Sequence, residues 1–174
     1  MSAKDIIIKP ISSKDARLIT AKYHYSGKST QNSCLHLGVF YKNKCEGVLQ
    51  FGSPIDRRKL LQLVKDTPWN DMFELNRMAF SDALPKNSES RALAISFKLI
   101  KKHYPNIKWV VSFADACQCG DGAIYRASGF VLTNIKKNTT MLKMPDGSIV
   151  ADKTLNYHPT RKSGWWKKNG ATPL

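Results

Sequence analysis

Apolar residues recur along most of the chain at the spacing of β-strands, and this pattern predicts a sheet. Two runs flank a polar turn at residues 41–47, which is typical of an antiparallel hairpin. The run that ends at Asp115 is almost continuously apolar, so we expect both faces of that strand to be covered. The predicted strands lie at residues 6–12, 34–40, 48–53, 72–80 and 107–115, with a further strand beginning at residue 131.

Apolar residues three or four positions apart predict two main helices between these strands. The first begins near Ser12, a favourable N-cap, and places Ala16, Ile19 and Tyr23 on one side. The second begins near Asn87 or Ser88, ends before Pro105, and carries one apolar face made of Leu93, Phe97, Ile100 and Tyr104. Shorter helices are expected within residues 55–66 and 122–130. The order of elements predicts one mixed-sheet α/β domain over residues 1–174, with a basic arm from about residue 153.

The charge of the chain points to a polyanionic partner. Lys and Arg number 28 against 13 Asp and Glu, which gives a net charge of +15. Such a field attracts nucleic acid, although a lysine-rich solvated surface is the simpler explanation. Aromatic residues are interleaved with the basic ones near the C-terminus, as in arms that hold nucleic acid. This is the favoured interpretation, and tryptophans that close a core are the alternative. The candidate DNA-contacting residues are Arg57, Arg58, Arg161, Lys162, Trp165, Trp166 and Lys167.

Other compositional features limit where the protein works. No stretch approaches the roughly 20 apolar residues of a membrane span, and the N-terminus lacks a signal-peptide core. We therefore expect a cytoplasmic protein with reduced thiols. Cys117 and Cys119 are one residue apart, unlike the CxxC spacing of structural zinc. Packed thiols are the favoured interpretation, and a zinc site that includes a histidine is the alternative.

Polar residues at the ends of predicted elements are candidates for catalysis. Asp115 closes a strand at its carboxyl end, where open α/β sheets bind ligands; a loop or capping role is the alternative. Arg77 shares an expected strand face with the apolar residues Phe73, Leu75 and Ala79. A charge among such neighbours needs a partner, and we expect Asp115 to supply it, either for function or as a structural ion pair. His24 and Tyr25 fall where a helix runs into a polar loop, a common place for substrate contacts.

The order of elements, together with the segment "AIYRASGF", resembles the GCN5-related N-acetyltransferase fold. That resemblance implies acetyl-CoA as a donor and a leaving-group proton from Tyr125, which could otherwise be a core aromatic residue. The loop "SDALPKNSESRA" stands where that superfamily has a glycine-rich pyrophosphate loop, yet it contains no glycine. A helix N-terminus still offers N–H groups to a phosphate. The candidate cofactor-binding residues are Asn87, Ser88, Ser90 and Arg91, and an ordinary capped helix is the alternative.

Several separated motifs resemble the Mom family of phage DNA-modification proteins. They are "HYSG", "LGVF…GVLQFG", "ELNRMAFSDALPKNSES" and "KWVVSFAD…G…GAIYRASGF". This resemblance implies that the protein converts adenine in DNA to an N6-carbamoylmethyl derivative, which protects phage DNA from restriction. The positions that match the family motifs are His24, Tyr25, Arg77, Asp115 and Tyr125.

The implied product is joined to adenine through a methylene carbon, whereas acetyl transfer would give an amide. The donor therefore differs from acetyl-CoA, or an additional step takes part, such as one that uses a redox metal like iron; the sequence contains no compelling 2-His-1-carboxylate set. Two other functions stay open. One is a conventional acetyl-CoA-dependent N-acetyltransferase that acts on a protein or a small amine, and the other is a non-enzymatic nucleic-acid-binding protein.

Overall fold

The computed structural model describes residues 2–61, 63–115, 120–136, 141–151 and 170–173, without the side chains of Arg57, Lys59 and Ala151. The chain divides into two compact units, residues 1–132 and 133–174. None of the described helices is both long enough and apolar enough to cross a membrane.

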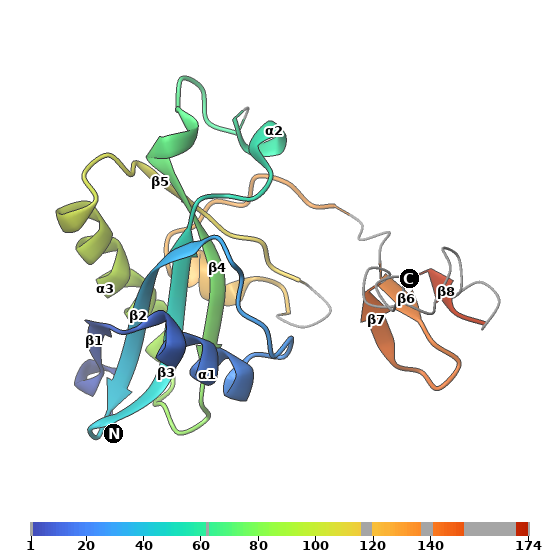
Figure 1. The fold of residues 1–174 in the computed structure, drawn as a ribbon, viewed down its shortest axis with the longest axis horizontal. Coiled ribbons are helices and arrows are strands. Elements are labelled where there is room, and N and C mark those ends of the chain that lie inside the picture. The colour runs from blue at the N-terminus through green and yellow to red at the C-terminus, as the bar shows by residue number, and fades with distance from the viewer. Residues whose placement is uncertain (1, 62, 116–119, 137–140, 152–169, 174) are drawn as a thin grey trace. The chain divides into compact units, whose positions relative to one another are not determined.

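A five-stranded sheet in the order β1-β2-β3-β4-β5 forms the centre of the first unit (Figure 1). Strands β1 to β4 pair antiparallel, and β5 runs parallel to β4 at the edge of the sheet. The predicted hairpin is confirmed, with its turn at Lys42 and Asn43, both at positive φ. The strands are β1 (Ile7–Pro10), β2 (Ser33–Tyr41), β3 (Lys44–Gly52), β4 (Met72–Phe80) and β5 (Trp109–Val111).

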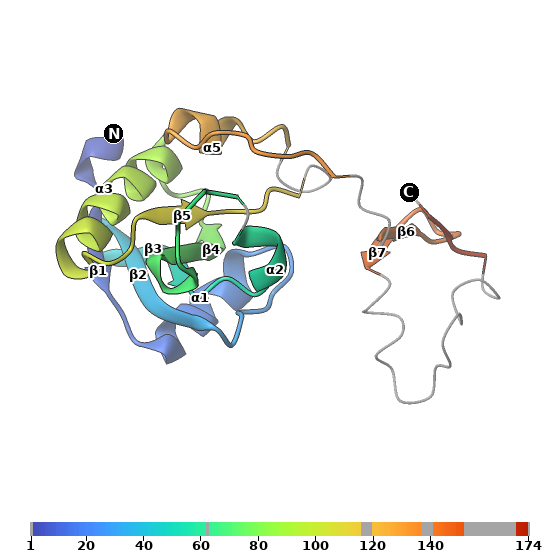
Figure 2. The ribbon, with the colours of Figure 1, turned by 90° about the horizontal axis from the view of Figure 1, so that it is seen from above.

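Helices cover both faces of this sheet. Helices α3 and α5 lie on one face and α1 on the other (Figure 2). Helix α1 begins as predicted, because the Ser12 hydroxyl accepts a hydrogen bond from the Asp15 amide. The helices are α1 (Ser13–Tyr23), α2 (Arg57–Leu60), α3 (Ser88–His103) and α5 (Ala123–Ala127), with 3-10 turns η1 (Ala3–Asp5) and η2 (Trp69–Asp71).

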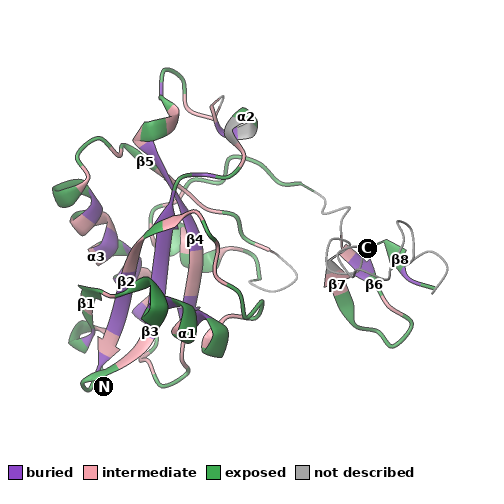
Figure 3. Ribbon diagram, in the orientation of Figure 1, coloured by how far each residue is buried: buried purple, intermediate pink, exposed green. Residues whose placement is uncertain are grey.

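The core is divided by the sheet, and buried residues concentrate along β2, β3 and β4 (Figure 3). On the α3 face, Leu93 and Ile100 pack against the sheet together with Phe97 and Tyr104, which confirms the predicted apolar face. On the other face a smaller cluster is made of Ala16, Val48 and Ala79, flanked by Ile11, Ile19 and Tyr23.

A β-bulge interrupts β4 at Asn76. Gln50 of β3 pairs with Arg77, but the next residue, Phe51, pairs with Leu75, so Asn76 is an extra residue. Alternation of side chains therefore reverses at this position. Leu75 belongs to the core under α3, whereas Arg77 has the same parity as Ala79, which packs under α1. The prediction that Arg77 shares a face with Phe73 and Leu75 is wrong, because a strict period of two does not survive a bulge.

The strand predicted at residues 107–115 is much shorter and less buried than expected. β5 has three residues, Trp109 is 48% exposed and Phe113 is 61% exposed. The physical reason is that β5 is the edge strand of this sheet, so it has a neighbour on one side only. The strand predicted from residue 131 is also absent over residues 131–136, where Val131, Leu132 and Ile135 are exposed.

The second unit contains a small three-stranded sheet in the order β7-β6-β8. Its strands are β6 (Met141–Lys143), β7 (Ile149–Ala151) and β8 (Thr172–Pro173). Leu142 and Ala171 are buried and form its local core, with Met144 and Val150 packed beside them. Most of the predicted basic arm, residues 152–169, lies outside the described residues.

Candidate functional site

A pocket of about 210 Å³ opens where β4 is bulged and β5 has already ended. The C-terminal end of α1, the middle of β4, the chain after β5 and the start of α5 all contribute to its lining. Four of the five predicted catalytic residues meet here, namely His24, Tyr25, Arg77 and Tyr125. The remaining lining residues are Tyr23, Leu75, Asn76, Met78, Phe113, Gly122 and Ile124.

Asp115 is half-buried and is not among the described residues that line this pocket, although Phe113, two residues earlier, is one of them. Because β4 and β5 run parallel, Asp115 and Arg77 both lie beyond the paired part of their strands, towards the carboxyl ends. An ion pair between them stays a prediction.

The guanidinium of Arg77 is fixed by main-chain carbonyls. Its Nε donates to the carbonyl oxygen of Lys28 at 2.7 Å and its Nη1 donates to that of Asn76 at 2.6 Å. The first bond ties the loop after α1 to β4, and the second spans the bulge. These bonds hold a positive charge at the pocket in one orientation.

His24 has a defined hydrogen-bonding role. Its Nδ1 accepts a hydrogen bond from the Ser26 amide at 3.1 Å and lies 2.8 Å from the Ser26 hydroxyl oxygen. Because an amide N–H can only donate, the neutral ring must carry its proton on Nε2. Burial, and then the charge of Arg77, lower the pKa of His24 to about 4. The ring therefore is neutral near pH 7, with Nε2–H as a donor, and in this geometry it is a poor general base.

The position of Tyr25 and Tyr125 combines packing with access to the pocket. The Tyr25 ring stacks on His24 with centroids 4.3 Å apart and is 59% exposed. The Tyr125 ring packs edge-on against Phe130 at 5.4 Å, and Phe130 in turn packs against Phe97 at 5.6 Å. Tyr125 packs against the core and also lines the pocket, and its role as a proton donor stays a prediction.

Four buried polar atoms of the described side chains have no hydrogen-bond partner within the protein, and one of them, on Asn76, lines this pocket. Among the described side chains, these atoms are Asn76 Nδ2, Gln50 Oε1, Ser29 Oγ and Ser112 Oγ. Asn76 lines the pocket and Gln50 is the cross-strand partner of Arg77. Ser29 follows the residue whose carbonyl binds Arg77, and Ser112 precedes Phe113. Native proteins rarely leave such atoms unsatisfied, so Asn76 Nδ2 is available to a polar group bound in the pocket.

A second hollow, of about 520 Å³, lies at the start of α3. Asn87, Ser90 and Arg91 line it as predicted for a cofactor-binding surface, and Lys4 and Lys86 add two more positive charges. Asn87 adopts a left-handed conformation with φ of 69° and makes no side-chain cap, so the first N–H groups of α3 are not capped by a side chain. This donor set fits an anionic group such as a pyrophosphate.

Ser88 does not share this surface with the other three. Its side chain is fully buried, and its hydroxyl donates to the carbonyl oxygen of Pro85 at 2.6 Å. Ser88 therefore belongs to the turn that starts α3, which is the ordinary structural role that the sequence left open.

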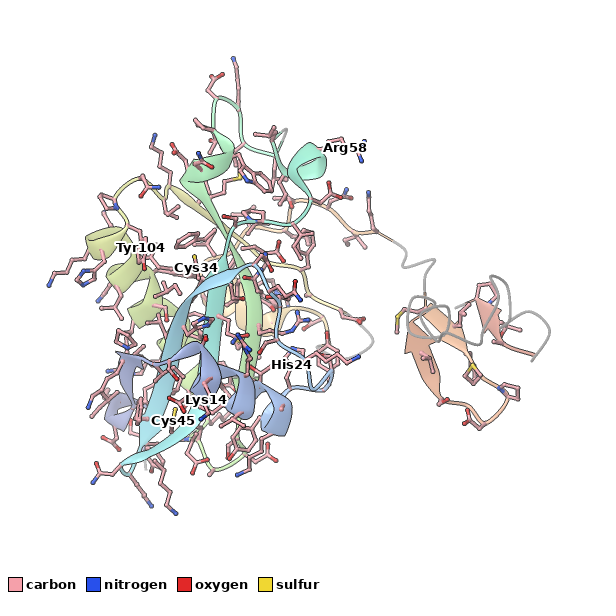
Figure 4. The ribbon with its side chains drawn as sticks, viewed as in Figure 1. Lys14, His24, Cys34, Cys45, Arg58 and Tyr104 are labelled. Atoms are coloured by element: carbon pink, nitrogen blue, oxygen red, sulfur yellow. The ribbon has the colours of Figure 1, made fainter. Side chains whose placement is uncertain are left out.

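The remaining candidates contribute less to the described structure. Arg58 is exposed on α2, at the opposite end of the sheet from the hairpin turn (Figure 4). Arg57 is placed only through its backbone, and Arg161, Lys162, Trp165, Trp166, Lys167, Cys117 and Cys119 lie outside the described residues. Within the described part of the chain, no three His, Cys, Asp or Glu side chains are grouped closely enough to hold a metal ion. Cys34 is the extra residue of a bulge in β2, and its side chain is exposed. Burial raises the pKa of the half-buried Cys45 thiol.

Seven lining residues are absent from the candidates that the sequence provided, and Phe113 and Asn76 are the two of them that bear most on ligand binding. Phe113 falls inside the strand predicted at residues 107–115 but lies two residues beyond the observed end of β5, so the predicted strand gave no signal of a ligand contact. Asn76 looks like an ordinary strand position in the sequence, and only the pairing register reveals that it forms a bulge.

The architecture is that of the GCN5-related N-acetyltransferases, which confirms the predicted fold class. The AAC(6')-Iy enzyme, solved with a CoA-S-monomethyl-acetylneamine bisubstrate analogue, superposes with a TM-score of 0.58 at 8% identity, over 76% of this chain and 95% of that one. The aminoglycoside 6'-N-acetyltransferase AAC(6')-IG from Acinetobacter haemolyticus gives a TM-score of 0.55 at 16% identity, over 76% and 95%. These similarities establish the fold alone.

Sequence comparison narrows the assignment within this fold. The model of the Mom protein family matches residues 5–173, and the chain belongs to the Mom protein family. It is 42% identical over 129 residues to the methylcarbamoylase Mom of Escherichia phage Mu. The aligned part is 74% of this chain and 53% of the phage Mu protein, so the chain spans about half the length of that relative.

Proposed function

We propose that this protein is a phage-type DNA-modification enzyme that attaches a carbamoylmethyl group to N6 of adenine. The observation that carries the proposal is the meeting of His24, Tyr25, Arg77 and Tyr125 in one pocket. These residues come from three separate segments of the chain, and each belongs to a motif that resembles the Mom family. Membership of the Mom family and 42% identity to a methylcarbamoylase support the same reaction.

The size and charge of the pocket suit one base taken out of the DNA stack. Its volume, about 210 Å³, is below the roughly 300–1,000 Å³ of sites for drug-sized ligands. Adenine N6 is paired within the duplex, so the base must be extruded at a cost of a few kcal/mol. The net charge of +15 favours approach to DNA by attracting its phosphates.

The reaction must replace one N6 proton with a carbon atom. The N6 lone pair forms a bond to the methylene carbon of a carbamoylmethyl donor, the bond from that carbon to its leaving group breaks, and N6 loses a proton. Because the neutral His24 ring has its proton on Nε2, Asp115 is the better candidate to accept the N6 proton. Arg77 stabilises negative charge on the departing group, and Tyr125 donates a proton to it.

His24 then acts as a hydrogen-bond donor. Its Nε2–H would donate to the amide oxygen of the donor or to a ring nitrogen of the base, and the Ser26 amide keeps the ring in the required tautomer. The charge of Arg77, which helps to lower the His24 pKa, thereby also keeps this donor neutral.

The donor is held, in our proposal, by the basic hollow at the start of α3. Lys4, Lys86 and Arg91 would bind the phosphates of a coenzyme A-type carrier, together with uncapped N–H groups of the helix. Such a carrier supplies a thiolate leaving group. Acetyl-CoA itself would deliver an acyl carbon and form an amide, so the transferred group must be attached through its methylene carbon.

The test is mass spectrometry of nucleosides from the DNA of cells that express the protein. We expect a deoxyadenosine heavier by one carbamoylmethyl group, and DNA that resists restriction endonucleases. Asp115→Asn should lower the yield of this nucleoside at least tenfold, whereas Asp82→Asn, a matched change on an exposed turn, should not. Unmodified DNA from cells with folded protein would refute the proposal.

The same cells separate the two other functions. Acetylation of a protein or a small amine by acetyl-CoA, with unmodified DNA, would identify a conventional N-acetyltransferase. DNA binding that Asp115→Asn leaves unchanged, without any modified nucleoside, would identify a protein that only binds nucleic acid.

A further inference from the structure

Phe113 is an unusual member of the pocket lining. Its side chain is 61% exposed although it lines the pocket, two residues beyond the end of β5. The other aromatic residues of the lining already have described neighbours: Tyr125 packs on Phe130, Tyr25 stacks on His24, and the Tyr23 hydroxyl donates to Glu46. Among the described residues, no ring contact involves Phe113.

Exposed apolar side chains gather at the opening of this pocket. Tyr25 and Ile124, which are 59% and 36% exposed, line it together with Phe113. A polar surface lies deeper in the pocket, at the bulge of β4. Asn76 has an unpartnered Nδ2 there, and Arg77 has a fixed positive charge. A ligand with a flat apolar face and a polar edge matches this arrangement, and a nucleobase has both.

We propose that Phe113 provides the stacking face for the adenine that is extruded from DNA. This inference rests on the proposed function and names a residue that the motifs did not select. A phenylalanine ring has no hydrogen-bonding group, so it contributes position and affinity rather than proton transfer. Stacking of one base on an aromatic ring is worth about 1–3 kcal/mol, which offsets much of the few kcal/mol that extrusion costs.

The direct test uses DNA duplexes with 2-aminopurine opposite a mismatched base, which lowers the cost of extrusion. Fluorescence of this adenine analogue reports its stacking as protein is added. We expect Phe113→Leu to raise the dissociation constant obtained from the 2-aminopurine titration about 5- to 150-fold, which corresponds to the loss of one base–ring stack. Phe113→Trp should retain the response, because it keeps an aromatic face.

Trp109→Leu is the matched control, since Trp109 is an exposed aromatic residue at the other end of β5 and does not line the pocket. Thermal melting should be unchanged in Phe113→Leu, because an exposed side chain contributes little to the core. The response to added salt should also be unchanged, because Phe113 makes no phosphate contact.

The outcomes separate this inference from the proposed reaction. If Phe113→Leu and Trp109→Leu respond to 2-aminopurine like the wild type, the stacking role is refuted, even when cells still contain modified adenine. If the response requires Phe113 but no modified nucleoside forms, base binding stands and the proposed reaction fails.

Discussion

The lowered pKa of His24 predicts how the stability of the protein depends on pH. The pKa of His24 is lowered from the ordinary value of 6.5 to about 4 by burial and by the charge of Arg77. In the unfolded chain this ring takes up a proton at about pH 6.5, whereas in the folded protein it does so only near pH 4. Between these values the unfolded state binds more protons, so the free energy of unfolding falls as the pH is lowered from 6.5 to 4.

The size of this effect follows from the pKa difference. One pKa unit corresponds to about 1.36 kcal/mol, and screening by water around a half-buried ring reduces the total contribution to about 1–2 kcal/mol. Above pH 6.5 both states are neutral at this position, and below pH 4 both are protonated, so the contribution of His24 is constant outside this window.

His24→Asn is the informative substitution. The asparagine side chain can still accept the hydrogen bond of the Ser26 amide near the position of Nδ1, but it neither titrates nor provides the Nε2 donor. Between pH 7.5 and pH 4, the free energy of unfolding measured with urea should fall by about 1–2 kcal/mol less in His24→Asn than in the wild type. His103→Asn, at the exposed end of α3, is the control: its free energy of unfolding should decrease over this pH range by as much as that of the wild type.

Titration of the imidazole resonances by NMR measures the same quantity directly. A midpoint near 4 for the signal that disappears in His24→Asn is expected. His36, whose pKa is also lowered by burial and by Arg17, should remain as a second signal in both proteins. A His24 midpoint at 6 or above, or equal acid sensitivity of His24→Asn and wild type, would refute the assigned environment and the donor role.

Two further substitutions test the two hollows separately. Arg77→Lys removes the paired donors that reach the carbonyl oxygens of Lys28 and Asn76. We expect the free energy of unfolding in urea to fall by about 1–3 kcal/mol and the amount of modified adenine to fall at least tenfold. Unchanged values would contradict the assigned contacts. Arg91→Gln should weaken binding of coenzyme A about fivefold in calorimetry without affecting the 2-aminopurine response, and equal affinity would exclude this surface from donor binding.

The parts of the fold that local chemistry determines were predictable from the sequence. Ser12 caps α1, and Leu93 and Ile100 mark the buried face of α3, because caps and helical periodicity are set by neighbouring residues. The run that ends at Asp115 was misjudged, since apolar content does not reveal whether a strand lies at the centre or the edge of a sheet. The place of Asn76 was equally hidden, because a bulge is a relation between two strands.

The candidate site was predictable to a similar extent. Motifs selected His24 and Arg77, and the structure brings both to one pocket. The tautomer of His24 depends on the Ser26 amide, and the burial of Ser88 depends on Pro85, so neither could be derived from residue type. Phe113 falls within the strand predicted at residues 107–115, where an aromatic residue is usually part of the core, so the sequence does not mark it as a ligand contact.

The extra residue in β4 reverses which side of the sheet the odd-numbered residues of this strand face. Before the bulge, the odd-numbered residues Phe73 and Leu75 face α3. After the bulge, the odd-numbered residues Arg77 and Ala79 face the α1 side of the sheet. Deleting residue 76 would restore a regular pleat and leave Arg77 opposite Gln50 on its present face, but it would remove the Asn76 side chain from the pocket. The nine residues of β4 therefore serve both the core and the pocket, and Leu75 and Met78 belong to both.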